Sequence, residues 1–230
     1  MEQVIVFGNG QMASMMYYYL TQDSPFEVVA FTVNGEHLED NTLLGLPVVP
    51  FENIECSYPP GQFAVSIPIS YRNANHLRAE KYYEAKSKGY RLINYVSSKA
   101  TTWPGLVIGD NCIIHEGCVI QPFTEIAHNV FMGCGSLVGH HCVIGEHCFL
   151  GPGSVILGSV RVEPYCLLGA NSTIKDGVTV ARECIVGAGI TIVRNTRAQE
   201  VYIGDRVEPS KKRSDELRQW LTWSTPPRAG

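Results

Sequence analysis

Two adjacent histidines, His140 and His141, are the residues of this chain best suited to proton transfer. Histidine changes charge near neutral pH, so it acts as a general base when it is held beside a reacting group. Gly158 follows His140 by eighteen residues, and its exposed backbone N–H is the kind of donor that stabilises an oxyanion. A surface histidine is usually solvated, so this chemistry depends on elements that bring these residues together.

A glycine turn near the start of the chain, Gly8-x-Gly10-x-x-Ala13, is suited to phosphate binding. It follows an apolar run at 4–7 and opens a helical stretch to about residue 20, which predicts a strand, a tight turn and a helix. The start of such a helix presents backbone N–H groups and the positive end of a dipole to a phosphate. The candidate substrate-binding residues in this turn are Gly8, Asn9, Gly10 and Gln11.

Asn34 is a further candidate for substrate binding, because it lies just past a second predicted strand at 28–32. A full dinucleotide fold has an acidic residue near this point, which binds a ribose hydroxyl. An amide still forms hydrogen bonds there, but it weakens the case for NAD. The first part of the chain, residues 1–98, is also short for a dinucleotide fold, so we expect it to bind one nucleotide or a nucleotide sugar.

An internal repeat provides the elements that position His140. Residues 107–196 divide into fifteen hexads without an insertion, with an aliphatic residue at every second place and a small or β-branched residue at every sixth. This period predicts a parallel β-helix with three flat sides and eighteen residues in each of five coils. Residues eighteen apart are then stacked, so we expect Gly158 directly above His140 at a corner.

Six of the eight cysteines occupy the inward sixth place, where a free thiol behaves as a small apolar group. We therefore expect these six to be reduced and unbridged. Cys134 points outward, but no histidine stands directly above or below it, so it is a weaker candidate nucleophile. The inward cysteines are Cys112, Cys118, Cys142, Cys148, Cys166 and Cys184.

One strip of the β-helix carries almost no side chains at the third to fifth places of its hexads. Glycines at the fifth place suit turns with positive φ, and the additional small residues leave room for a long, thin ligand along the axis. The pantetheine arm of coenzyme A has this shape. The candidate cofactor-binding residues are Gly151, Gly169, Ala170, Gly187 and Ala188 in the strip, together with Gly158.

The chain divides into a Rossmann-like α/β domain at 1–98, the β-helix at 99–205, and a short helix and tail at 206–230. In the last part we expect the helix over 208–223. In the first part we expect a helix from Ser70, as N-cap, to residue 88, stopped by Gly89. The expected strands of the first part, beyond the first, are 28–32, 47–49, 63–67 and 91–95.

Composition excludes several kinds of partner. The chain has 230 residues and a formal net charge of −4, so it has no basic field that would hold a nucleic acid. No apolar run approaches the length of a membrane span, and the first residues, with an acid and a short apolar run, do not resemble a signal peptide. We expect a cytoplasmic protein that binds neither nucleic acid nor a membrane.

Several segments resemble the bacterial nucleotide-sugar N-acyltransferases of the PglD/NeuD type. They are Val-Ile-Val-Phe-Gly-Asn-Gly at 4–10, Leu-Gly-Leu-Pro-Val-Val at 44–49, Val-Gly-His-His-Cys-Val-Ile-Gly at 138–145, Pro-Gly-Ser at 152–154 and Gly-Ala-Gly at 187–189. The resemblance implies a left-handed β-helix and a homotrimer with the acyl donor between neighbouring β-helices. It also implies transfer of an acyl group, expected to be acetyl, from acetyl-CoA or another acyl-CoA to the amino group of a nucleotide-linked sugar, a 4-amino-4,6-dideoxyhexose. No metal is expected.

The resemblance also assigns roles to two residues. His140 matches the general base of the family, and Gly158 matches the glycine whose N–H meets the thioester carbonyl. Three positions depart from the pattern. His141 replaces an acid that orients the base, Phe149 replaces a second histidine, and Gly133 replaces an asparagine. Because of these differences, the identity of the transferred acyl group stays open.

Three alternatives remain at this point. A sugar O-acyltransferase would use the same histidine on a hydroxyl. The same β-helix serves gamma-type carbonic anhydrases, in which histidines of adjacent subunits hold zinc. A non-catalytic module that binds a nucleotide sugar is the third.

Overall fold

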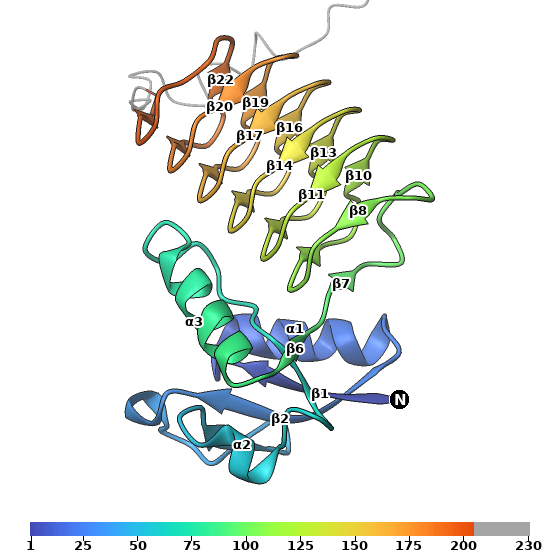
Figure 1. Ribbon diagram of the computed structural model, residues 1–230, viewed down its shortest axis with the longest axis vertical. Coiled ribbons are helices and arrows are strands. Elements are labelled where there is room, and N and C mark those ends of the chain that lie inside the picture. The colour runs from blue at the N-terminus through green and yellow to red at the C-terminus, as the bar shows by residue number, and fades with distance from the viewer. Residues whose placement is uncertain (205–230) are drawn as a thin grey trace, which may run out of the picture.

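The structure, a computed structural model, describes residues 1–204 and shows an α/β domain lying against a long β-helix (Figure 1). The helix expected over 208–223 lies outside the described residues. Within residues 1–204, no helix combines the length and the apolar character of a membrane span.

The N-terminal domain contains a six-stranded sheet with the order β3-β4-β2-β1-β5-β6. All neighbours are parallel except β3 and β4, which form an antiparallel pair. Side chains of β1 alternate between the two faces. Val4 and Val6 pack with α1, and Ile5 and Phe7 pack with α2 and α3. The strands are β1 (Glu2–Phe7), β2 (Phe26–Val33), β3 (Thr42–Leu43), β4 (Leu46–Pro50), β5 (Ala64–Ser66) and β6 (Arg91–Leu92); the helices are α1 (Gln11–Gln22), α2 (Ile54–Ser57), α3 (His76–Ser87) and the 3-10 helix η1 (Gly35–His37).

Two elements of this domain differ from the sequence prediction. The helix expected from Ser70 begins only at His76, because Asn73, Ala74 and Asn75 all have positive φ, which is incompatible with a right-handed helix. The strand expected at 91–95 divides into two. Its first half, β6, stays in the N-terminal sheet, while β7 (Tyr95–Val96) pairs with the first coil of the β-helix.

The coils form a three-sided, left-handed parallel β-helix in which strands eighteen residues apart are paired. The predicted register is confirmed throughout. The first side contains β8 (Val107–Ile108), β11 (Glu125–Ile126), β14 (Val143–Ile144), β17 (Arg161–Val162) and β20 (Thr179–Val180). The second contains β7, β9 (Ile113–Ile114), β12 (Phe131–Met132), β15 (Phe149–Leu150), β18 (Leu167–Leu168), β21 (Ile185–Val186) and β23 (Val201–Tyr202). The third contains β10 (Val119–Ile120), β13 (Leu137–Val138), β16 (Val155–Ile156), β19 (Thr173–Ile174) and β22 (Thr191–Ile192).

The interior of the β-helix is filled by the two inward columns of the repeat. Every second-place side chain is buried except Ile108, which lies partly buried in the first coil. The six inward cysteines are buried and unbridged, as expected. Burial raises the pKa of the Cys112 thiol to about 12, so this thiol is protonated and unreactive at neutral pH.

The second side of the β-helix is covered by the N-terminal domain of the same chain. Its outward side chains, Ile113, Phe131, Phe149 and Leu167, belong to one apolar cluster with α1 and β1. We call this side the covered face. At one of its edges, which we call the α3 corner (109–111, 127–129, 145–147 and 163–165), α3 lies along the coils (Figure 1).

Arg78 of α3 fixes the two parts together. Its guanidinium is 1% exposed and donates to the backbone carbonyl oxygens of His147 and Cys148 at 3.4 and 2.9 Å and of Ile69 at 3.3 Å. Burial lowers the pKa of Arg78 to about 10, so it remains charged at neutral pH. A buried cation is held here by peptide carbonyls of both domains.

The other two edges of the β-helix are the glycine corner (115–117, 133–135, 151–153, 169–171 and 187–189) and the histidine corner (121–123, 139–141, 157–159 and 175–177). The glycine corner is the second edge of the covered face. The histidine corner joins the third side to the first, so it lies opposite the covered face. The three corners therefore have different surroundings, although one repeat builds all of them.

Candidate functional site

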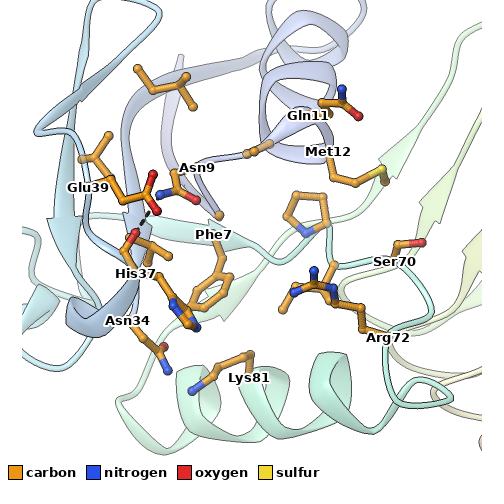
Figure 2. Close-up of a pocket in the computed structure, with 18 of the residues that line it drawn as sticks. Phe7, Asn9, Gln11, Met12, Asn34, His37, Glu39, Ser70, Arg72 and Lys81 are labelled. Atoms are coloured by element: carbon orange, nitrogen blue, oxygen red, sulfur yellow. Dashed lines mark hydrogen bonds between the residues drawn. The ribbon is translucent and has the colours of Figure 1, made fainter.

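The glycine turn opens onto a cavity of about 720 Å³ (Figure 2). Gly8 has a φ of +113°, and a Cβ there would lie 3.4 Å from the Cβ of Ala13, so the turn brings strand β1 close to helix α1. The Asn9 side chain crosses the cavity floor and donates to the His37 carbonyl oxygen at 2.9 Å. The predicted substrate-binding residues that line this one cavity are Gly8, Asn9, Gly10, Gln11 and Asn34.

Two cations of this cavity, Arg72 and Lys81, could not be predicted from the glycine turn, because they lie far along the chain from it. Arg72, between β5 and α3, is exposed and has no carboxylate partner among the described residues. Lys81 of α3 contacts Glu84 at 2.7 Å and Glu80 at 3.4 Å. Burial alone would lower the pKa of Lys81, but these two carboxylates outweigh it and the pKa is raised. Among the described lining residues, which also include Glu39 and Asp40, Arg72 is therefore a cation without an ion-pair partner.

His140 lies exposed at the histidine corner with its ring against Gly158 of the next coil. A Cβ on Gly158 would lie 2.7 Å from Cε1 of this ring, so only glycine allows the contact. The backbone N–H of His140 donates to Oε1 of Gln121 at 3.0 Å. The structure thus brings His140 and Gly158 together as the repeat predicts.

His141 supplies the side-chain partner of His140. The two Nδ1 atoms lie 3.1 Å apart, which requires that one of them carries the proton. His141 has a φ of +56°, and its ring packs against Phe123 with centroids 4.7 Å apart. An imidazole held at Nδ1 in this way keeps a fixed orientation.

The N–H of Gly158 already has a partner in the structure. It donates to Oδ1 of Asp176, one coil further on, at 3.0 Å. This bond is not predictable from the sequence, because stacking alone does not show where an exposed carboxylate turns. Asp176 is exposed, so its side chain can leave the N–H without disturbing the fold.

The glycine corner shows why the strip of small residues exists. A Cβ on Gly133, Gly151 or Gly169 would lie 2.6 to 2.7 Å from an atom of the next coil. The fifth-place glycines, such as Gly135 and Gly153, have φ near +70°. Both columns are thus explained by close coil stacking and by turning, a reason that the sequence analysis did not weigh for the third place. The predicted cofactor residues of the strip lie together on this corner.

Other reactive side chains lie apart from His140. Cys134 is exposed on the glycine corner, a different edge of the β-helix. Within residues 1–204, no three His, Cys, Asp or Glu side chains are grouped closely enough to hold a metal ion.

The cavity at the glycine turn and His140 lie on different sides of the chain. The N-terminal domain packs on the covered face, whereas His140 lies on the opposite corner. A ligand held in the cavity therefore does not reach His140 of the same β-helix by a direct path across the coils.

Comparison with known proteins supports this fold. The family described as the GMPPB C-terminal domain matches residues 93–186, less than half of the chain. No curated protein matches the chain significantly.

Solved structures match nearly the whole chain. PerB from Caulobacter crescentus, in complex with CoA and GDP-perosamine, is 24% identical over 88% of this chain and 92% of its own, with a TM-score of 0.72. The acetyltransferase domain of PglB from Neisseria gonorrhoeae, in complex with acetyl coenzyme A, is 19% identical over 87% of this chain and 95% of its own, with a TM-score of 0.75. WeeI from Acinetobacter baumannii is 23% identical over 89% and 97%, with a TM-score of 0.74. The chain has the fold of these proteins.

Proposed function

We propose that this protein transfers an acyl group from an acyl-CoA, most simply acetyl-CoA, to the amino group of a nucleotide-linked 4-amino-4,6-dideoxyhexose. The observation that carries the proposal is the exposed His140 packed on Gly158, on a chain that also contains a glycine-turn cavity of nucleotide size. The fold shared with PerB, which was solved with CoA and GDP-perosamine, supports the same assignment.

The acceptor nucleotide binds in the cavity of the N-terminal domain. The start of α1 and the side chain of Arg72 hold its phosphates, since the helix start is the positive end of a dipole and Arg72 forms no ion pair within the described residues. Asn9, Gln11 and Asn34 supply amide groups for the sugar or base.

His140 acts as the general base. Its Nδ1–H donates to Nδ1 of His141, which leaves a lone pair on Nε2. The sugar amine attacks the thioester carbonyl, a C–N bond forms, and Nε2 accepts the proton of the amine. The tetrahedral intermediate then collapses with breakage of the C–S bond, and the CoA sulfur leaves with that proton. General-base catalysis of this kind is worth about 10² to 10⁴ in rate.

Gly158 stabilises the oxyanion of the intermediate through its N–H, once Asp176 has turned away. The pantetheine arm lies along the small residues of the glycine corner, which are Gly151, Gly169, Ala170, Gly187 and Ala188, while Gly158 on the histidine corner meets the thioester carbonyl. The acyl-CoA donor supplies a thioester that is already activated, so the reaction needs no metal.

The working form is a homotrimer. One chain holds its nucleotide cavity and its base on different sides, so the acceptor bound to one chain reaches His140 of a neighbour. Cyclic symmetry provides such a neighbour for each of three chains.

The decisive experiment incubates the purified protein with acetyl-CoA and a panel of UDP-, dTDP- and GDP-linked 4-amino-4,6-dideoxyhexoses. We expect release of the CoA thiol together with a product that mass spectrometry shows to be acylated on nitrogen and that resists hydroxylamine. A hydroxylamine-sensitive product would establish O-acylation instead. Absence of product with every acceptor would refute the proposal. Light scattering should report the mass of three chains, and a monomer would contradict the shared site.

A further inference from the structure

A second, smaller cavity of about 240 Å³ lies beside the candidate base at the start of the β-helix. Its walls are formed mainly by Trp103, Pro104, Leu106, Gln121, Pro122 and Phe123. Two of these contact the base region directly. The side chain of Gln121 accepts the N–H of His140, and the ring of Phe123 packs on His141. The cavity therefore shares two of its walls with residues that contact His140 and His141.

The aromatic rings of this cavity are open to solvent. Phe123 is 76% exposed and Trp103 is 54% exposed. Phe123 also has a φ of +63°, a conformation that costs energy for a residue with a bulky side chain. The same place of other coils also has positive φ, with asparagine at Asn111, Asn129 and Asn171 and with rings at His141, His147 and Tyr165. Tyr165 and His147 pack against side chains of the N-terminal domain, whereas Phe123 is exposed, so burial does not explain its ring.

We propose that this cavity, with Phe123 and Trp103 as its aromatic walls, binds the amino-sugar ring of the acceptor. This inference rests on the proposed function and names the part of the site that selects the sugar. A hexose ring has apolar C–H faces that stack on aromatic rings, and its hydroxyl edges accept or donate hydrogen bonds. The NH₂ group of Gln121 makes no hydrogen bond within the described residues and is available to a hydroxyl.

The order of residues along the histidine corner distinguishes the sugar from the acyl chain. Phe123, His140 and Gly158 lie in three successive coils, with His140 between the other two. The thioester carbonyl belongs beside Gly158, and the amine must touch His140. The ring that carries the amine then extends to the remaining side, where the cavity lies. Its apolar walls favour a ring with a methyl group at C6 over one with a hydroxymethyl group.

The best test is Phe123→Asn, because asparagine suits the left-handed conformation and removes the ring. We expect the melting temperature to stay the same or rise, while KM for the nucleotide-linked 4-amino-4,6-dideoxyhexose rises at least about fivefold. KM for acetyl-CoA should change less than about twofold. Trp103→Leu should act in the same direction. Tyr18→Ala, which removes an exposed aromatic of α1, serves as the control and should leave both KM values unchanged.

Calorimetry gives a readout that does not require catalysis. Wild-type protein should bind the nucleotide sugar more tightly than the free nucleotide, and Phe123→Asn should remove this difference while keeping the affinity for the nucleotide. If wild-type protein acylates no acceptor, the proposed function fails, and the binding difference still decides whether the cavity holds a sugar.

Three results would overturn the inference. An unchanged acceptor KM with an unchanged binding difference means that the rings do not touch the sugar. A raised KM for acyl-CoA, or a changed preference for acyl chain length, means that the cavity holds the acyl group. Dissociation of the oligomer by Phe123→Asn means that the rings contact a second copy of the chain.

Discussion

His147 and His140 occupy corners of the same β-helix, but their surroundings give them opposite properties. At the α3 corner, His147 is fully buried, with Nδ1 2.8 Å from Nδ2 of Asn129 and Nε2 2.9 Å from the hydroxyl of Tyr83. At the histidine corner, His140 is exposed, and within residues 1–204 its imidazole has one hydrogen-bond partner, the imidazole of His141. Both ring nitrogens of His147 are used by the fold, whereas His140 keeps one nitrogen for chemistry.

The difference arises from what packs on each corner. Helix α3 covers His147, and burial together with the charge of Arg78 lowers its pKa to about 4. His147 is therefore neutral and fixed at neutral pH. No described element covers His140. A repeat can place equivalent residues at every corner, but the added domain decides which of them stay available.

The largest effect that this comparison predicts is on catalysis at the open corner. His140→Ala should lower kcat by about 10² or more, because the base is used in the transition state. The affinity for the nucleotide sugar should stay nearly unchanged, since the N-terminal domain holds the nucleotide. Steady-state kinetics and calorimetry measure the two quantities.

His141→Ala is the matched variant and should cost less, because it removes only the group that orients the base. If His141→Ala gives the larger loss, the base is His141 and the alignment of the site is displaced by one residue. If neither variant loses activity, general-base catalysis by this pair is wrong and Cys134 becomes the residue to test.

The α3 corner, which holds His147, should control the stability of the protein and the dependence of that stability on pH. Below about pH 6.5 the unfolded chain binds a proton on His147 that the folded chain binds only near pH 4, so the free energy of unfolding falls as pH drops through this window. From pH 7 to pH 5 the loss is on the order of 2 kcal/mol, or about 4 to 8 °C in melting temperature. Scanning calorimetry at the two pH values measures it.

His147→Gln should weaken this pH dependence, because an amide does not titrate in this range. A part should remain, since burial also lowers the pKa of His115. If the variant loses as much stability as wild type between pH 7 and pH 5, His147 is not the group responsible.

The smallest predicted effect concerns Asp176, whose carboxylate accepts the N–H of Gly158. Asp176→Ala frees the N–H that we assign to the oxyanion, so KM for acetyl-CoA should fall about two- to fivefold. Asp176→Asn removes the negative charge but keeps the N–H occupied, because the amide oxygen still accepts it. It should give a smaller improvement. A KM that rises in both variants would show that Asp176 helps to hold the donor rather than competing with it.

The β-helix was predictable from sequence in nearly all respects, because each hexad repeats the same inward places. The pairing of Phe131 with Phe149, and the stacking of Gly158 on His140, follow from the period alone. Only at the first coil does the pattern weaken, where Ile108 lacks a preceding coil to cover it completely.

The N-terminal domain was less predictable, because its details depend on contacts distant in sequence. Asn75 ends the loop before α3 in a left-handed conformation, and its side chain donates to the carbonyl oxygen of Cys166, 91 residues away. Likewise Arg72 joins the cavity at the glycine turn only through folding. No local pattern of residues signals either placement, and the exposed ring of Phe123 is explained only when its neighbours are known.

The buried guanidinium of Arg78 has a consequence for how the chain comes apart. Its acceptors are carbonyl oxygens of the coils and of the loop after β5, and it forms no ion pair with a carboxylate within residues 1–204. Pulling α3 away from the β-helix would leave this cation in an apolar interface until water reached it. It would also remove the Arg78 donor from the His147 carbonyl and from the Cys148 carbonyl, of which the second keeps only the N–H of Phe131. Partial opening along this boundary is therefore disfavoured, and we expect the two parts to melt as a single cooperative unit rather than as independent domains.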